Sequence, residues 1–334
     1  MDRVRIGVLG AARIAPKAVL TPAKTVPEAE VVAIAARDPA RAAAFATKHA
    51  IPRVHESYET LIADDEIDAI YNPLPNGLHG EWTIAALRAG KHVLCEKPFT
   101  ANAAEAAEVA AAAERTGKVV MEAFHYRYHP LMARVLEIVG TLGPIRDIST
   151  HMIAVLPNKK DVRYQIDLAG GATMDVGCYA IHQMRTVAGS VPERTTGSVP
   201  TVTSAVAKLA APGVDRAMQA RFSFADGCTG SMDCALLAAR APIADLKVTG
   251  ERGTTRVMFP TRPQLGWITT SAGGTTRRER VKGEATFWYQ LQAFCGAVLR
   301  GEPVLTPPAD AVANMRVIDA VYEQAGLGAR TPAP

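Results

Sequence analysis

The sequence predicts a two-domain α/β protein: a doubly wound parallel sheet, then an α+β domain with a large, mostly antiparallel open sheet. Its 334 residues are too many for one ordinary domain and enough for two. Over residues 1–126, strand-like and helix-like segments alternate, which is the βαβ rhythm of a parallel sheet. Over 127–330 this alternation stops, which argues against a single (β/α)₈ barrel.

The first domain is predicted from apolar runs and the helical segments between them. Five β-branched, apolar runs are expected as buried parallel strands: 4–9, 30–36, 67–71, 92–95 and 119–124. Helices are expected from Ala12, over 39–49, after the capping residue Ser57, over 82–88 and over 100–115.

The second domain is predicted from a different pattern. Helices are expected over 131–139 and 170–187, and an extended segment over 145–155. From 201 to 280 the chain reads strand–turn–strand, with turns at 225–227, 250–253 and 272–274, which indicates an antiparallel sheet. Two helices, 287–299 and 309–324, follow, and the tail from Gly326 is expected to fray.

The composition is that of a globular protein with real cores. Hydrophobic residues make up 48%, charged residues 21%, and the net charge of +4 is scattered along the chain. The densest basic stretch, 277–280, is interrupted by Glu279 and lacks interleaved aromatic residues, so we interpret it as a solvated turn or strand edge. Neither a nucleic acid nor a membrane is expected as a partner.

The cysteines favour a reducing compartment. Five occur, at 95, 178, 228, 234 and 295, an odd count without a CxxC pair. A disulfide framework or structural zinc is therefore not expected. Because the sequence enters a strand at once, it leaves no room for a signal peptide, and we expect a cytoplasmic protein.

A small-residue turn follows the first strand. Gly10-Ala11-Ala12-Arg13-Ile14-Ala15 occupies the GxGxxG position, where the first glycine permits a tight turn and small residues let the backbone approach a pyrophosphate. The following helix would present free N–H groups to the phosphates. Alanines replace two glycines, and small turns also serve packing. The place after strand one of an alternating chain nevertheless favours a dinucleotide-binding Rossmann domain.

The end of the second strand bears on the choice of dinucleotide. NAD enzymes usually place an acid there to hold the ribose 2′-hydroxyl, whereas this strand ends Ala36-Arg37-Asp38. Arg37 can pair with a 2′-phosphate, which favours NADP. The neighbouring Asp38 leaves NAD open, and Arg37 can also be read as an ordinary surface arginine.

A lysine follows the fourth strand, in Cys95-Glu96-Lys97-Pro98. Lys97 would lie at the carboxyl edge of the parallel sheet, where ligands bind in such folds. There it can hydrogen-bond a substrate hydroxyl and take part in its proton transfer. Pro98 disfavours a helical Lys97. Taken alone, the segment also fits a surface lysine at a strand end.

Several segments together resemble one known family. The glycine turn, the loop over 70–79, the segment 90–98, the strand exit over 121–130 and the Gly-Gly helix over 170–182 resemble the glucose–fructose oxidoreductase / inositol dehydrogenase (Gfo/Idh/MocA) family. The resemblance covers nearly the whole chain. Inositol dehydrogenases carry a histidine where this chain has Tyr179, so the dihydrodiol dehydrogenase / xylose dehydrogenase branch is favoured.

The resemblance implies a set of catalytic residues. Lys97 would be the active-site lysine and Tyr179 the proton donor or acceptor. Asp175 lies four residues before Tyr179 on the same helix face and would orient Lys97 or a substrate hydroxyl. His182 would touch the substrate. Both residues also have a structural interpretation: Tyr179 could be a core residue, and Asp175 could cap the helix.

The resemblance and the motifs also assign residues to the ligands. The cofactor set is Gly10, Ala11, Ala12, Arg13, Ile14, Arg37, Pro73, Leu74, Asn76, His79, Glu96, Lys97 and Arg127. The substrate set is Lys97, His125, Arg163, Asp175, Tyr179 and His182. His125 and His129 have i,i+4 spacing, but without a third acidic ligand no metal is expected, and His125 is expected to shape the pocket.

These residues predict an NAD(P)-dependent oxidoreductase that transfers a hydride between NADP(H) and a carbinol or carbonyl carbon of a sugar, polyol or dihydrodiol. One alternative is a nucleotide-linked 3-ketosugar reductase, with Arg163, Lys159 and Lys160 as candidates for the diphosphate. Another is a non-catalytic NADP-binding regulator, which would be expected to lose Lys97 or Tyr179. The resemblance further implies a homodimer or homotetramer formed through the second domain.

Overall fold

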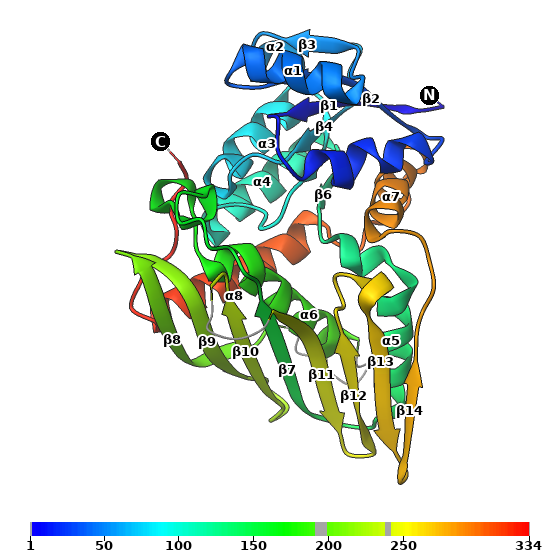
Figure 1. Ribbon diagram of the computed structural model, residues 1–334, viewed down its shortest axis with the longest axis vertical. Coiled ribbons are helices and arrows are strands. Elements are labelled where there is room, and N and C mark those ends of the chain that lie inside the picture. Colours follow the sequence, from blue (N-terminus) through cyan, green and yellow to red (C-terminus); the bar gives the residue numbers. More distant parts are fainter. Residues whose placement is uncertain (1, 191–198, 238–241, 334) are drawn as a thin grey trace. The chain divides into compact units, whose positions relative to one another are not determined.

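The computed structural model describes residues 2–190, 199–237 and 242–333 (Figure 1). The chain forms two compact units, and each is built from two segments. The first unit comprises Met1–Tyr128 with Glu284–Val312, and the second comprises His129–Gly283 with Ala313–Pro334. The units therefore differ from the continuous division 1–126 and 127–330, because residues 284–312 belong to the first one.

The first unit contains a six-stranded parallel sheet of order β3-β2-β1-β4-β5-β6, as predicted for a doubly wound fold. Its strands are β1 (Val4–Leu9), β2 (Ala29–Ala35), β3 (Arg53–His55), β4 (Ala69–Asn72), β5 (His92–Cys95) and β6 (Val120–Glu122). The sequence analysis missed β3, because three partly exposed residues make no apolar run. The strand order reverses between β1 and β4, which is the switch point where such sheets bind ligands.

Capping side chains mark the starts of three of the first unit's main helices. The main helices are α1 (Pro39–His49), α2 (Tyr58–Ile62), α3 (His79–Arg88), α4 (Ala103–Thr116) and α7 (Thr286–Arg300). Asp38 caps α1, Asn102 caps α4, and Ser57 forms a capping box with Thr60 at α2. The helix expected from Ala12 begins only at Pro16, as a short π-helix, because proline is favoured at a first helical position.

Helix α7 completes the core of the first unit. Its buried side chains Phe287, Leu291 and Phe294 pack in one apolar cluster with residues of β1 and β2. Beyond α7, Thr306 pairs with the end of β6: its hydroxyl donates to the Glu122 carbonyl (2.7 Å), and its own carbonyl accepts from the Glu122 N–H (3.1 Å). A late segment of the chain thus supports the edge of the first sheet.

The second unit contains an eight-stranded sheet of order β14-β13-β12-β11-β7-β10-β9-β8. The strands are β7 (Ile145–Ile153), β8 (Thr201–Ala211), β9 (Val214–Ser223), β10 (Thr229–Ala235), β11 (Ile243–Gly250), β12 (Gly253–Met258), β13 (Trp267–Ala272) and β14 (Thr275–Glu279). All pairings are antiparallel except that of β7 with β10. The mostly antiparallel sheet was predicted; the insertion of β7 into its middle was not.

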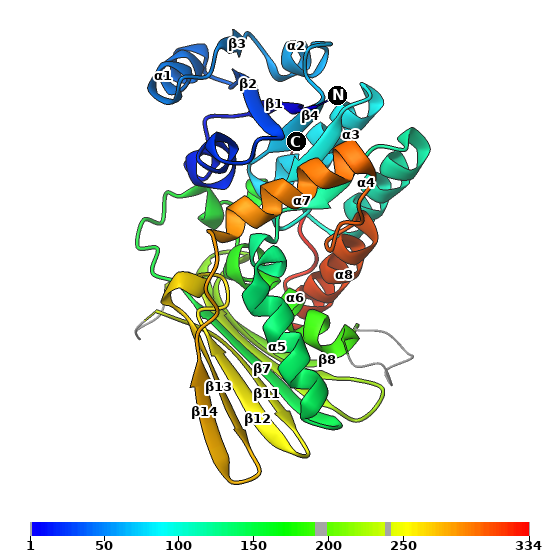
Figure 2. The same ribbon diagram turned by 90° about the vertical axis from the view of Figure 1, so that its right-hand side faces the viewer.

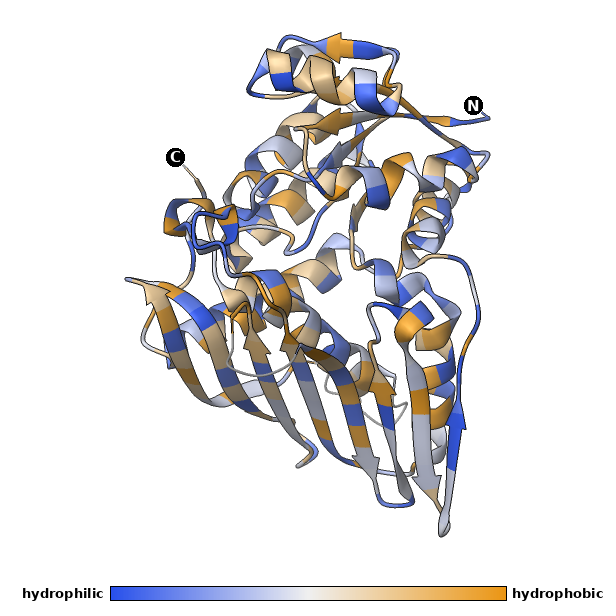
Figure 3. Ribbon diagram, viewed as in Figure 1, coloured by the Kyte–Doolittle hydropathy of each residue, from blue (hydrophilic) through white to orange (hydrophobic). Residues whose placement is uncertain are grey.

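Helices cover one face of this sheet. Helices α5 (Pro130–Thr141) and α6 (Cys178–Gly189) lie against the same face, and α8 (Pro308–Gln324) reaches the second unit with its later turns (Figure 2). Apolar and polar residues alternate along the strands, as expected for a sheet with one buried face (Figure 3). Among the described residues, no helix is long and apolar enough to cross a lipid bilayer.

The tail after Gly326 is anchored, contrary to the expectation that it frays. The Arg330 side chain is buried and donates from Nε to the Gly170 carbonyl at 3.0 Å. It also forms an ion pair with Asp215 at 3.1 Å. Chain ends fray when nothing holds them. Here the burial and pairing of Arg330 hold the tail against the second unit.

Candidate active site

The predicted cofactor residues of the first unit lie at one edge of its sheet. Gly10 follows β1, Arg37 follows β2, Pro73 follows β4, Lys97 follows β5, and His125 follows β6. Because all these strands are parallel, their carboxyl ends meet at the same edge. The β1/β4 switch point lies within this edge, so the arrangement is that of a dinucleotide site.

The turn after β1 requires a glycine and is held from two sides. Gly10 has a φ of +79°, a conformation that side chains rarely adopt. Its N–H donates to the Ala35 carbonyl (2.7 Å), and an added Cβ would come within 3.0 Å of Leu74 Cδ2. Arg41, which sequence reasoning missed, donates to the Ala11 carbonyl at 2.9 Å and so fixes the turn to α1.

The two charged residues after β2 have different surroundings. The Asp38 carboxylate accepts from the Arg41 N–H at 3.2 Å and caps α1. Arg37 is exposed to solvent beside it. The Asp38 carboxylate therefore caps the helix, and the Arg37 side chain beside it faces solvent.

His79 braces the two loops beside the switch point. Its Nε2 lies 2.7 Å from the Leu74 carbonyl oxygen, and its Nδ1 lies 2.8 Å from that of Pro98. Two carbonyl acceptors favour a protonated ring, but burial outweighs them and lowers the pKa of His79 to about 4. The ring lies between the loop after β4 and the loop that carries Lys97, and in its neutral form it can donate to only one of the two carbonyls.

Lys97 is positioned through its neighbours. The Tyr71 hydroxyl donates to Glu96 Oε1 at 2.8 Å, and the other Glu96 oxygen lies 3.4 Å from the Lys97 backbone N. The Lys97–Pro98 peptide bond is cis. The lysine is thus held by a strand end, a buried carboxylate and the His79 brace.

His125 and His129 have different hydrogen-bond partners. His125 shares a hydrogen bond with Thr286 (2.7 Å) and stacks on Phe287 at a ring distance of 4.1 Å. His129 belongs to the other unit, where its Nδ1 accepts from the Leu131 N–H (3.0 Å) and caps α5. Arg127 lies in the short 3₁₀-helix that begins at His125. In the part of the chain that the structure describes, no group of three His, Cys, Asp or Glu is placed to hold a metal ion.

The candidate residues of the second unit lie on one helical segment. A short π-helix, Thr173–Gly177, runs directly into α6, and the two carry Asp175, Tyr179 and His182. The helix starts at Thr173, and not at Gly170 as expected, because Gly170 and Gly171 form the turn before it. Asp175 therefore lies in the first helical turn.

Arg163 is paired with two carboxylates of the same unit. Its Nε lies 3.0 Å from Asp175 Oδ1, and its Nη1 lies 3.0 Å from Asp161 Oδ1. These two charges, that of Asp175 first, raise the pKa of Arg163 above its ordinary value. Asp161 was not predicted as a site residue; its place two residues before Arg163 was the one signal for it.

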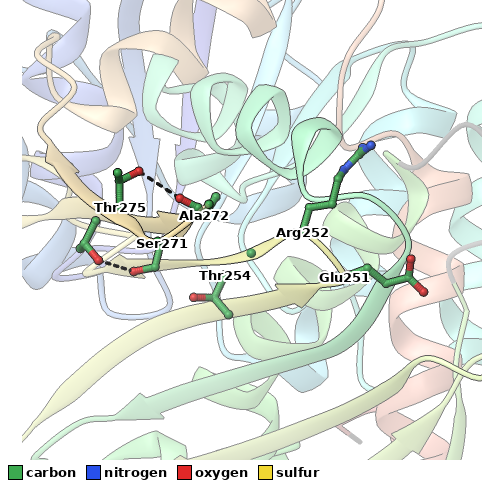
Figure 4. A pocket seen from close by; sticks show the side chains of 11 residues that line it. Glu251, Arg252, Thr254, Ser271, Ala272 and Thr275 are labelled. Carbon is green, nitrogen blue, oxygen red and sulfur yellow. Dashed lines mark hydrogen bonds between the residues drawn. The ribbon is translucent and has the colours of Figure 1, made fainter.

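A shallow hollow lies elsewhere in the second unit. The ends of two hairpins line it, with the residues 250–254 and 271–276 (Figure 4). None of the predicted site residues is among them.

A small-residue turn at the switch point of a parallel sheet, with a lysine at the same edge, is typical of the class of nicotinamide-dinucleotide oxidoreductases. Comparison with known families agrees. Residues 4–124 match the "Oxidoreductase family, NAD-binding Rossmann fold", and residues 132–256 match the "GFO/IDH/MocA C-terminal domain". The chain belongs to this Gfo/Idh/MocA oxidoreductase family.

Relatives of known activity align along most of the chain. It is 38% identical to D-xylose 1-dehydrogenase (NADP(+)) 2 of Haloferax volcanii, over 97% of this chain and 98% of that one. It is 33% identical to trans-1,2-dihydrobenzene-1,2-diol dehydrogenase of Sus scrofa, over 70% and 67%. A 3-ketoreductase from Actinomadura kijaniata, solved with NADP and TDP-benzene, superposes with a TM-score of 0.86 at 29% identity, covering 99% of both chains.

Proposed function

We propose that this enzyme is an NADP-dependent dehydrogenase that oxidises a carbinol carbon of a free sugar or polyol. It belongs to an oxidoreductase family whose compared members act on sugars, dihydrodiols and ketosugars. The observation that carries the proposal is Lys97, held at the same sheet edge as the small-residue turn after β1. A non-catalytic regulator would have no need to maintain this lysine's support.

NADP is the cofactor that the end of β2 supports. The Asp38 carboxylate caps α1, and we propose that the exposed Arg37 binds the 2′-phosphate. The Haloferax volcanii relative is named for NADP(+), and the Actinomadura kijaniata ketoreductase was solved with NADP. The other cofactor residues of the first unit would hold the pyrophosphate and the nicotinamide.

Proton transfer is proposed for Lys97 and Tyr179, with Asp175 as the residue that orients them or the substrate. The bound cofactor supplies the hydride chemistry. General acid–base help of this kind contributes about 10²–10⁴-fold. His125, Arg163 and His182 would line the substrate pocket.

The surroundings of Arg163 favour a neutral sugar over a nucleotide-linked one. A diphosphate needs uncompensated positive charge, whereas Arg163 already faces the carboxylates of Asp161 and Asp175. Lys159 and Lys160 are exposed in a turn before it. The superposition on a ketoreductase that holds TDP-benzene keeps the nucleotide-linked ketosugar as a second candidate.

The experiment is a two-armed assay of the purified enzyme. In one arm, NADPH formation is followed with NADP and a panel of free aldoses, polyols and dihydrodiols. In the other, NADPH consumption is followed with a nucleotide-linked 3-ketosugar. Turnover in the first arm alone supports the proposal, turnover in the second alone replaces it, and tight NADPH binding without turnover in either arm favours a regulator.

We further propose a cytoplasmic homodimer or homotetramer. All five cysteines are buried thiols, which fits a reducing compartment. Within the second unit, the sheet face opposite α5 and α6 carries a charged array: His151 lies 2.7 Å from Asp245, and register places Asp233 on its other side. A copy of the same face can complement such alternating charges.

A further inference from the structure

We infer that the C-terminal tail holds the start of the proposed catalytic helix in place, and that Arg330 and Asp215 are positioning residues. The inference rests on the proposed roles of Asp175 and Tyr179. All residues involved belong to the second unit. Neither Asp215, in β9, nor Arg330, near the end of the chain, carried any signal in the sequence.

Asp215 is fully buried, and each of its oxygens accepts two hydrogen bonds. Oδ2 accepts from the Thr173 backbone N–H (2.8 Å) and from the Thr173 hydroxyl (2.7 Å). Oδ1 accepts from the Tyr322 hydroxyl (2.9 Å) and from Arg330 (3.1 Å). The carboxylate thereby joins the first residue of the catalytic helix to α8 and to the tail.

Arg330 closes the other side of the same junction. Its Nε donates to the Gly170 carbonyl at 3.0 Å, and its guanidinium lies over the Tyr322 ring at 3.7 Å. A buried carboxylate needs such a counter-charge, because it has lost its contact with water. The arginine therefore links the glycine turn to the carboxylate that holds Thr173.

The glycine turn transmits this geometry to the candidate residues. The Gly171 N–H donates to the Arg163 carbonyl (2.9 Å), and the Gly171 carbonyl accepts from the Asp175 N–H (3.0 Å). Gly171 has a φ of +140°, and an added Cβ would lie 2.1 Å from Asp215 Oδ1. The tail thus sets the backbone of both members of the Arg163–Asp175 pair, and Tyr179 follows one turn later.

The test compares Arg330→Ala and Arg330→Lys in the full-length enzyme. With a substrate found in the two-armed assay, we expect Arg330→Ala to lower kcat about 10–100-fold, with NADPH affinity within twofold of wild type. Arg330→Lys, which keeps the charge, should recover most of the loss. Added guanidinium should partly rescue Arg330→Ala but not Tyr179→Phe.

Hydrogen exchange of the peptide 170–182 supplies a readout that needs no substrate. It should exchange faster in Arg330→Ala, while a first-unit peptide over 92–102 stays unchanged. If the peptide exchanges faster in Arg330→Ala but the wild type turns over no substrate, the proposed function is wrong and the positioning role of Arg330 is supported. If Arg330→Ala fails to fold, Tyr322→Phe, which removes one donor to Asp215, takes its place. A folded variant with wild-type kcat and wild-type exchange over 170–182 overturns the inference.

Discussion

At the scale of single residues, the neighbours of a charge decide what it can do. Arg37 and Arg163 are both arginines in loops, but Arg37 is exposed beside a carboxylate already used as a helix cap. Arg163 lies between two carboxylates. The first is suited to an incoming phosphate and the second to ordering a pocket for a neutral polyol.

Replacing Arg37 with alanine tests the cofactor preference. Loss of a charge-assisted contact to the 2′-phosphate should raise the KM for NADP about 10–30-fold, equivalent to about 1.5–2 kcal/mol. The KM for NAD should change little, because NAD lacks this phosphate. Steady-state kinetics with both dinucleotides give the comparison. Arg88→Ala, an exposed arginine at the end of α3, is the matched control and should change neither value.

The sequence predicted those residues whose position along a strand implies their role. Gly10, Arg37 and Lys97 follow apolar runs, and the carboxyl ends of parallel strands meet at one edge. Asp161, Asp215 and Arg330 were not predicted, because their roles depend on partners chosen by the fold. Asp215 and Arg330 are 115 positions apart in the chain, and periodicity says nothing about such a pairing.

At the scale of elements, propensity and capping placed most helices and strands within a few residues. The exceptions have local causes. The first helix begins at Pro16 and not at Ala12. Strand β3 is too short and too exposed to show an apolar run. The place of β7 in the middle of the second sheet arises from long-range pairing with β10 and β11, which a strand's own sequence does not specify.

His92, the first residue of β5, predicts a pH-dependent stability. Its Nδ1 accepts from the Val119 N–H at 3.0 Å, and burial lowers its pKa to about 4. Between pH 6.5 and 4, His92 is therefore protonated in the unfolded chain but neutral in the folded protein. Its contribution to the free energy of unfolding falls as the pH falls. Since the ring is partly exposed, we expect about 1–2 kcal/mol from this residue.

The measurement is the free energy of unfolding from urea titrations of wild type and His92→Gln at pH 7 and pH 4.5. Glutamine keeps an acceptor for the Val119 N–H but does not titrate. The difference between the two proteins should shrink or reverse at the lower pH. Parallel losses in both proteins would show that His92 contributes nothing to the acid sensitivity.

At the scale of the whole molecule, each compact unit is built from two separated segments. Helix α7 and the residues after it complete the first unit, and the tail completes the second. The sequence predicted two domains with the right sheet types, but it ordered them one after the other. Nothing in a helical pattern states which of two cores the helix will join, because both cores offer apolar surface.

The open face of the second sheet predicts self-association. Ser149 lies on this face, in register between Ser231 and Lys247. If a second copy covers the face, Ser149→Arg should convert a dimer or tetramer to a smaller species, because it buries an unpaired charge. Sedimentation velocity measures the mass. Ala107→Arg, on the exposed surface of α4, is the control. A monomeric wild type at tens of micromolar would contradict the proposal.

The most direct test of the central claim follows the hydride itself. The enzyme is incubated with NADP and a free sugar or polyol that it turns over, deuterated at every carbon-bound position, and the NADPH formed is analysed by mass spectrometry. The account predicts that deuterium moves to the cofactor, and that Lys97→Met and Tyr179→Phe slow this transfer about 10²–10⁴-fold while NADPH still binds. Unlabelled NADPH from the fully deuterated substrate, or full transfer rates in the Lys97→Met enzyme, would contradict it.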